Sequence, residues 1–252
     1  MKIALTGKGG VGKSTLAVMI ARVVRDQSNK VVAIDADPDM NLATLFDIST
    51  EREITPIVEM KELIAERTGT EVGQPAPFFT MNPKVDDIPE KYWVDQNGIK
   101  LLVMGTVQRG GGGCACPENA FLKSLLGHMM IARQEWVILD MEAGIEHLGR
   151  GTALGVDYML VVVEPNRTST ETAHRIQKLA ADIGVKKVRV VGNKVSTTSD
   201  QDLIRKACEG LEILGFLPLS EQIRQISTGE ISLEQVDEQT LDPVHALVKR
   251  LT

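Results

Sequence analysis

The sequence predicts an α/β fold with a doubly wound, mostly parallel sheet, and two observations support this prediction. Short apolar runs rich in β-branched residues recur along the chain, separated by longer stretches with helical periodicity. Most of these runs lack strict alternation of apolar and polar residues, as is typical of strands that helices cover on both faces. No linker or internal repeat divides the chain. We therefore expect residues 1–252 to form a single domain.

The expected elements follow one another along the chain as strands and crossover helices. Strands are expected at Lys2 to Thr6, Lys30 to Ile34, Ile99 to Met104, Trp136 to Leu139, Tyr158 to Val163, Lys187 to Val191 and Leu211 to Leu217. Helices are expected at Lys13 to Gln27, Pro56 to Glu66, Pro117 to Ala132, Thr168 to Ile183, Gln201 to Cys208 and Pro243 to Leu251. Pro117 and Pro243 are placed at helix starts, where a missing N–H costs nothing. Residues 68–98, with four prolines and three glycines, fit neither period, so we expect an excursion on one side of the fold.

Composition and charge exclude several classes of protein. The net charge of -6 and the nine aromatic residues (two Trp, two Tyr, five Phe) argue against nucleic acid as a partner. No apolar run approaches the roughly 18 residues that a membrane span needs, and the N-terminus lacks the apolar core of a signal peptide. A cytoplasmic protein is therefore expected. Three cysteines are too few for a disulfide framework and would be thiols or metal ligands in a reducing compartment.

The segment Gly7 to Ser14 reads G-K-G-G-V-G-K-S, follows an expected strand and opens an expected helix. It matches the phosphate-loop pattern G-x-x-x-x-G-K-[ST] in its required context. Backbone N–H groups would surround phosphate oxygens, Lys13 would neutralise the β and γ phosphates, and the Ser14 hydroxyl would bind Mg²⁺. The alternative is a glycine-rich turn that only caps a helix. The expected nucleotide contacts are Gly9, Gly10, Val11, Gly12, Lys13, Ser14 and Thr15.

A second lysine, Lys8, lies inside this loop. The resulting K-G-G-V-G-K-S resembles the deviant Walker A signature of the MinD, ParA, nitrogenase iron protein and arsenite-pump ATPases. The resemblance implies an ATPase in which Lys8 reaches the nucleotide of a partner subunit, so that ATP holds a homodimer together. A cation supplied in trans would stabilise transition-state charge only when two subunits meet. The alternative is a solvent-facing lysine.

Acidic residues follow two expected strands. By resemblance, Asp37 orients the attacking water and Asp35 supports the magnesium shell. A carboxylate beside the γ phosphate could also align water on chemical grounds alone. The alternative is that these acids cap the next helix, as Asp39 would. After a later strand, Asp140 and Gly144 form D-x-x-G, in which the Asp holds the magnesium water and the Gly N–H meets the γ phosphate.

Two weaker signals concern the nucleobase. Relatives use an Asn after the sixth strand to read the adenine edge, which points to Asn193, although Asn at a strand end is commonly a turn former. The stretch ending at Pro218 resembles the backbone wall that the family places around the base.

Cys114 and Cys116 follow four consecutive glycines. If Pro117 opens a helix, Cys116 lies near its N-terminus, where the helix dipole favours the thiolate. Two thiolates make half of a tetrahedral site, so two copies of the chain could complete an S4 site for Zn²⁺ or Ni²⁺. The alternatives are idle thiols or a redox disulfide. Cys208 is expected in the core, and the four histidines are expected to be structural.

Here the chain resembles the CooC-type nickel-insertion ATPases that mature carbon monoxide dehydrogenase. The resemblance covers nearly the whole length, including Ile54 to Pro56, Met81 to Val85, Met104 to Asn119, Gly144 to Leu148 and Glu164 to Asn166. It implies an ATP-dependent, dimerising metallochaperone that binds nickel at Cys114 and Cys116. The client would be carbon monoxide dehydrogenase or acetyl-CoA synthase. The alternatives are an iron–sulfur carrier or reductase of the same superfamily, or a positioning ATPase, although residues 242–252 are too short and weakly charged to anchor on a membrane.

Overall fold

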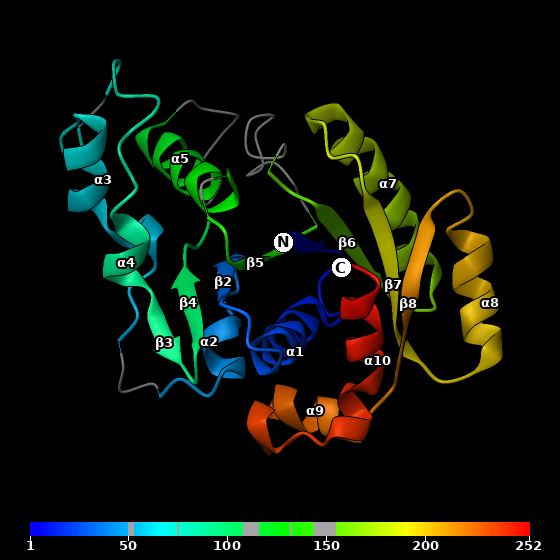
Figure 1. Cartoon of the computed structure of the whole chain (residues 1–252). Helices are drawn as coiled ribbons and strands as arrows, with labels where there is room; N and C mark the ends of the chain where they lie inside the picture. Colours follow the sequence, from blue (N-terminus) through cyan, green and yellow to red (C-terminus); the bar gives the residue numbers. More distant parts are fainter. Residues whose placement is uncertain (50–52, 75, 108–115, 132, 144–154) are drawn as a thin grey trace.

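A single mixed sheet organises the described part of the chain (Figure 1). The computed structural model describes residues 1–49, 53–74, 76–107, 116–131, 133–143 and 155–252. Within these residues the sheet has eight strands in the order β3-β4-β2-β5-β1-β6-β7-β8. Only the edge strand β3 is antiparallel to its neighbour. The strands are β1 (Lys2–Thr6), β2 (Val31–Ala36), β3 (Val94–Gln96), β4 (Ile99–Val103), β5 (Trp136–Met141), β6 (Tyr158–Val163), β7 (Val188–Val195) and β8 (Glu212–Pro218).

Helices cover both faces of the sheet, which confirms the doubly wound α/β prediction. One face carries α1 (Lys13–Asp26), α2 (Leu42–Leu45), α9 (Glu221–Thr228), the 3-10 turn η2 (Leu233–Gln235) and α10 (Glu238–Lys249). The other carries η1 (Ile57–Glu59), α3 (Lys61–Thr68), α4 (Ile88–Tyr92), α5 (Pro117–Ile131), α7 (Arg167–Ile183) and α8 (Thr198–Ala207). Among the described residues, none of these helices combines the length and apolarity that crossing a bilayer requires.

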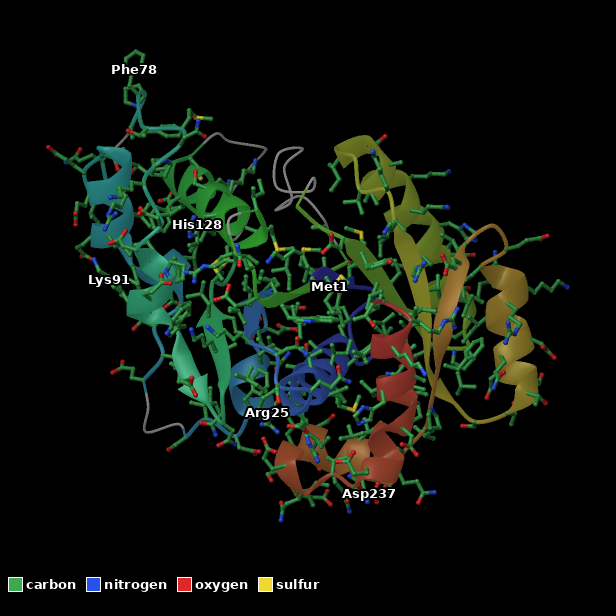
Figure 2. The ribbon with its side chains drawn as sticks, in the orientation of Figure 1. Met1, Arg25, Phe78, Lys91, His128 and Asp237 are labelled. Atoms are coloured by element: carbon green, nitrogen blue, oxygen red, sulfur yellow. The ribbon has the colours of Figure 1, made fainter. Side chains whose placement is uncertain are left out.

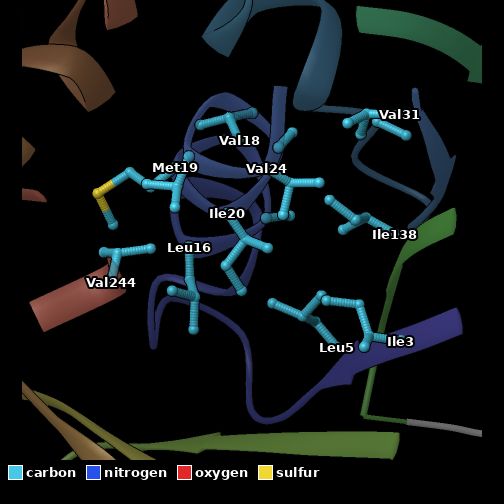
Figure 3. Close-up of a cluster of buried hydrophobic side chains, with 14 of the residues drawn as sticks. Ile3, Leu5, Leu16, Val18, Met19, Ile20, Val24, Val31, Ile138 and Val244 are labelled. Carbon is cyan, nitrogen blue, oxygen red and sulfur yellow. The ribbon is translucent and has the colours of Figure 1, made fainter. Parts of the chain in front are cut away.

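Helix α1 is enclosed on nearly all sides. Eleven of its 14 residues are buried, so it lacks the exposed polar face of a surface helix. Figure 3 shows Leu16 and Ile20 beside the strand residues Leu5 and Ile138, and Met19 beside Val244 of α10. Each such aliphatic side chain contributes roughly 1.5–3 kcal/mol when fully buried. The phosphate loop is therefore attached to one of the most firmly held elements of the molecule.

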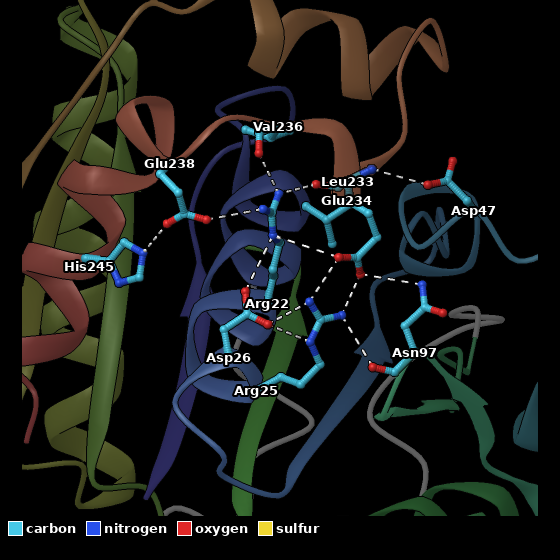
Figure 4. Close-up of polar contacts among 10 residues, drawn as sticks. All are labelled: Arg22, Arg25, Asp26, Asp47, Asn97, Leu233, Glu234, Val236, Glu238 and His245. Carbon is cyan, nitrogen blue, oxygen red and sulfur yellow. Dashed lines mark hydrogen bonds and ion pairs between the residues drawn. The ribbon is translucent and has the colours of Figure 1, made fainter.

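An arginine pair ties the end of α1 to the C-terminal segment (Figure 4). The buried Arg22 guanidinium donates to the carbonyls of Leu233 and Val236 at 2.5 and 2.9 Å. Arg25 donates to both carboxylate oxygens of Glu234, at 2.5 and 2.9 Å. Bidentate pairing of this kind fixes orientation as well as adding energy. The segment that leads from α9 to α10 is thus locked onto α1.

The structure corrects several expected elements. The helix expected over Pro56 to Glu66 is two elements, η1 and α3, separated at Met60, whose ψ of 67° lies outside the helical range. Pro243 lies inside α10 and does not begin it, because Asp237 caps the helix six residues earlier. The excursion at residues 68–98 contains α4 and β3, which were not expected. Pro117 does open α5, and Cys208 lies in the core at 1% exposure, as predicted.

The loop after α3 presents apolar side chains to solvent. Val72 and Met81 are exposed, and Phe78 is 89% exposed. Figure 2 shows Phe78 at the outer tip of this loop, well away from the sheet. A backbone hydrogen bond from Thr80 to the Thr68 carbonyl, at 2.8 Å, closes the loop at its base.

Candidate nucleotide site and cysteine site

A cavity of about 680 Å³ opens at the carboxyl ends of the parallel strands. The phosphate loop, residues 7–14, joins β1 to α1. In the sheet β1 lies between β5 and β6, so the strand order changes direction at this loop. Such switch points are where open α/β sheets bind ligands. The cavity is lined by Gly9, Gly10, Gly12, Lys13, Ser14, Thr15, Asp37, Asn41, Glu142, Asn193, Lys194, Pro218, Ser220, Ile223, Arg224 and Ser227, among others.

The loop has the backbone shape of an anion-binding nest. Gly10 and Gly12 have φ of 81° and 91°, in the left-handed region that favours glycine. A Cβ at Gly12 would also lie 2.4 Å from the Asn193 amide nitrogen. Alternating left- and right-handed residues point successive N–H groups into one concavity. The structure thus explains why glycine is needed at Gly12.

Lys13 and Asp37 face each other in this cavity. The Lys13 ammonium lies 3.3 Å from the Asp37 carboxylate, and both side chains are 7% exposed. The backbone N–H of Asp39 also donates to Asp37, at 3.1 Å. Asp37 is therefore oriented toward Lys13 in the cavity, and its role in orienting water stays a prediction.

Asp35 is engaged by the backbone. Its carboxylate accepts hydrogen bonds from the N–H groups of Asp37 and Leu42, at 3.2 and 2.9 Å, and so spans the turn that carries Asp37. Burial raises the pKa of Asp35 to about 7 against the effect of these hydrogen bonds. Its support of the magnesium shell stays a prediction. The following helix, α2, begins after Asn41, so Asp39 does not cap it.

Asp140 fits a magnesium site. It is fully buried, and neither carboxylate oxygen has a hydrogen bond of standard geometry within the described residues. Burial raises the pKa of Asp140 to about 6, partly offset by the nearby Ser14 hydroxyl and the Lys13 charge. A buried carboxylate beside a serine hydroxyl and a phosphate-binding loop is the donor set that Mg²⁺ uses with nucleotides.

The expected nucleobase residues lie in the cavity wall together with a helix that was not expected. Asn193 donates one amide hydrogen to the Val11 carbonyl at 2.7 Å, and its adenine role stays a prediction. Pro218 ends β8 and lines the cavity. Helix α9 adds Ser220, Ile223, Arg224 and Ser227, with Ser227 lying 3.3 Å from the Thr15 hydroxyl. The capping Ser220 followed by Ile223 and Ile226 was the signal that could have revealed α9.

Lys8 is exposed at the rim of the loop, as expected. Its ammonium donates to the Thr168 hydroxyl at 3.0 Å. Thr168 in turn donates to the Asn166 side chain, which caps α7. In this single chain Lys8 has an internal partner, and its action across a dimer stays a prediction.

Cys116 directly precedes α5, whereas Cys114 and Gly144 lie outside the described residues. Cys116 lines a second cavity, of about 320 Å³, together with residues 70–74. The backbone N–H groups at the helix start do favour the Cys116 thiolate, but two other effects outweigh them. Burial and the Glu118 carboxylate raise the pKa of Cys116 and outweigh the backbone hydrogen bonds at the helix start. Within the described ranges, no group of three or more His, Cys, Asp or Glu is arranged to hold a metal ion.

Known proteins resemble the chain over nearly its whole length. Residues 2–233 match the family described as the CobQ/CobB/MinD/ParA nucleotide binding domain. The carbon monoxide dehydrogenase accessory protein CooC of Rhodospirillum rubrum is 44% identical over 100% of this chain and 96% of its own length. An uncharacterised ATP-binding protein of Methanocaldococcus jannaschii is 46% identical over 88% of this chain and 87% of its own length. The MinD cell division protein of Aquifex aeolicus has the same fold, with a TM-score of 0.71 at 20% identity over 99% of this chain and 96% of that structure.

Proposed function

The chain belongs to the CobQ/CobB/MinD/ParA nucleotide-binding family as a CooC-type member, and on that premise we propose that it is an ATP-driven, dimerising nickel chaperone. Its clients would be carbon monoxide dehydrogenase or acetyl-CoA synthase. The observation that carries the proposal is the C-x-C pair, within a chain similar from end to end to a carbon monoxide dehydrogenase accessory protein. A cytoplasmic location, with no nucleic acid or membrane partner, completes the proposal.

Hydrolysis would use the residues gathered at the phosphate end of the cavity. Lys13 binds the β and γ phosphates, which breaks the 3.3 Å ion pair between Lys13 and Asp37. The freed carboxylate accepts a hydrogen bond from water and aligns it for in-line attack. Ser14 and Asp140 would hold Mg²⁺, which neutralises charge on the phosphates. Lys8 leaves Thr168 and stabilises the transferred phosphoryl group in a partner subunit.

Cargo binding would use thiolates from two copies of the chain. One chain supplies Cys114 and Cys116, and a two-fold axis supplies the same pair again to complete an S4 site for Ni²⁺ or Zn²⁺. Closure of the dimer by ATP would assemble this site, and hydrolysis would open it. Such coupling requires metal affinity to differ between nucleotide states.

Metal analysis of the purified dimer tests the proposal. Equilibrium dialysis with Ni²⁺ or Zn²⁺ should give one tightly bound ion per two chains, and a Cys114→Ser, Cys116→Ser variant should lose it. Cys208→Ala is the matched control, because that thiol is buried in the core at 1% exposure. Equal metal binding by wild type and the double variant would contradict the metallochaperone proposal.

An iron–sulfur cluster carrier or reductase-like ATPase is the second candidate, because it could use the same cysteine pair. Anaerobic reconstitution with iron and sulfide should then produce broad visible absorption that the double cysteine variant lacks. A colourless product would remove this candidate and leave the nickel function standing.

A further inference from the structure

Two consecutive residues of β7 bind two consecutive carbonyls of the phosphate loop. The Asn193 amide donates to the Val11 carbonyl at 2.7 Å, and the Lys194 ammonium donates to the Gly10 carbonyl at 2.8 Å. Neighbouring residues of a regular strand point to opposite faces of the sheet. The strand must therefore be irregular for both side chains to reach the same loop.

The backbone of β7 contains this irregularity. Its register with β8 shifts between Gly192 and Val195, and Lys194 has a φ of 57°. A non-glycine residue in the left-handed region carries a strain of roughly 1 kcal/mol or more. Bulges near active sites redirect side chains, and such strain persists only where the surroundings hold it. The bulge turns Lys194 onto the phosphate loop.

The contact fixes the orientation of a peptide that faces the cavity. In a trans peptide the C=O and the following N–H point in opposite directions. Lys194 binds the Gly10 carbonyl, so the N–H of the same peptide, which belongs to Val11, points away from Lys194. Asn193 binds the Val11 carbonyl and orients the Gly12 N–H by the same geometry. The Val11 N–H has only a 3.4 Å contact with the Lys8 carbonyl, longer than the usual 2.9–3.0 Å. This long contact is weak, so the Val11 N–H could donate to a phosphate oxygen in its place.

Glu164 keeps Lys194 in place. Its carboxylate lies 2.6 Å from the Lys194 ammonium, and its other oxygen accepts from Asn166 at 3.1 Å. A lysine so paired carries little free charge toward an anion. Its influence on phosphate therefore passes through the Gly10 peptide.

We propose that Lys194 is a positioning residue for phosphate binding, which preorganises the nest through the Gly10 carbonyl with Glu164 as its counter-charge. This role rests on the proposed nucleotide binding in the cavity. It goes further because phosphate binding would then also depend on Lys194, which lies outside the phosphate-loop motif. If this role is correct, loss of the Lys194 contact weakens the binding of phosphates but not of a nucleoside, because only the phosphates contact the phosphate-loop nest.

Calorimetric titration with Mg-ADP and with adenosine tests the proposal on the full chain. Lys194→Met should weaken Mg-ADP binding roughly tenfold while changing adenosine binding less than about twofold, since a charge-assisted hydrogen bond contributes on this scale. Lys194→Arg should recover most of the loss, and Lys206→Met, an exposed lysine on α8, should change neither affinity. In hydrolysis assays KM should rise more than kcat falls.

Equal losses for adenosine and Mg-ADP would overturn the proposal, because Lys194 would then contact the nucleoside. Unchanged Mg-ADP binding by Lys194→Met would overturn it as well. Lys194→Gln gives a second test if the Met variant folds poorly, with folding checked by circular dichroism. Wild-type protein that binds no Mg-ADP would instead refute nucleotide binding itself, which separates the two failures.

Discussion

At the scale of single residues, Asp140 is a buried carboxylate held at a cost to stability. Its pKa, raised to about 6 from 3.8, means that the folded protein keeps this proton to a higher pH than the unfolded chain does. Stability is therefore lost as the pH rises from about 4 to about 6, by roughly 2–3 kcal/mol for a shift of this size. The metal-free, nucleotide-free protein carries this cost at neutral pH.

Asp140→Asn should therefore stabilise the protein without Mg²⁺ or nucleotide at pH 7–8. The gain should shrink as the pH falls below about 6 and disappear well below pH 4, where the wild-type carboxyl is protonated in both states. Denaturant unfolding at several pH values measures it, with exposed Asp202→Asn as the control. A variant no more stable than wild type at pH 8 would contradict the assignment of Asp140 as an unpaired buried charge.

Burial raises the pKa of Cys116, and Glu118 adds to this effect. Its carboxylate contributes to the raised pKa of the thiol, and a metal must displace the thiol proton. Glu118→Gln should therefore raise the apparent Zn²⁺ affinity several-fold at pH 7, and the difference should vanish as the pH approaches the thiol pKa. Competition with a chromophoric chelator measures this, with Glu209→Gln as the control. Weaker binding by Glu118→Gln would show that the carboxylate is itself a ligand.

Sequence reasoning found the residues whose chemistry follows from a motif and missed those placed by the fold. Lys13, Ser14 and Asp140 could be predicted because each lies next to its strand and loop in the sequence itself. Lys194 and Ser227 were not, because a bulge and an unexpected helix bring them to the cavity from distant parts of the chain. The pKa of Cys116 was misjudged because burial, which the sequence does not reveal, outweighs the helix start.

At the scale of elements, capping chemistry decides where the last helix of the chain begins. Pro243 predicts a helix start at its own position, but Asp237 accepts a hydrogen bond from the Thr240 N–H at 2.7 Å and begins the helix earlier. The same carboxylate accepts from Gln222 of α9 at 2.7 Å, so this cap also joins two helices. Local capping chemistry thus decided the boundary against the proline signal.

Asp237→Ala should cost about 1 kcal/mol through loss of this cap. The melting temperature should fall by roughly 2–4 °C for a chain of this size. Asp237→Asn, which caps equally well, should melt close to wild type in the same calorimetric scan. If both variants melt alike, the cap contributes nothing and the contact with Gln222 would have to be reconsidered.

At the scale of the whole molecule, the proposed cycle separates dimer formation from hydrolysis. Asp37→Ala should still bind ATP and accumulate as a dimer, because only the orientation of water is lost. Lys8→Ala should bind ATP and stay monomeric, while Lys13→Ala should bind it at least tenfold more weakly, since a buried charged contact is removed. Sedimentation velocity with and without ATP distinguishes the three variants. A monomeric Asp37→Ala in saturating ATP would contradict its assignment.

The position of β1 also governs how the chain can be made. The first strand pairs Lys2 with Val137 of β5 and Ile3 with Tyr158 of β6, so the strand synthesised first sits between strands that come much later. Pairings this distant in sequence form slowly and only after both partners exist. On the ribosome, β1 has no strand partner until β5, which ends at Met141, has emerged, and its second partner β6 is complete only at Val163. During that interval the nascent chain exposes a helix of which 11 of the 14 residues are buried after folding, and we expect it to be a substrate for chaperones before it can bind nucleotide.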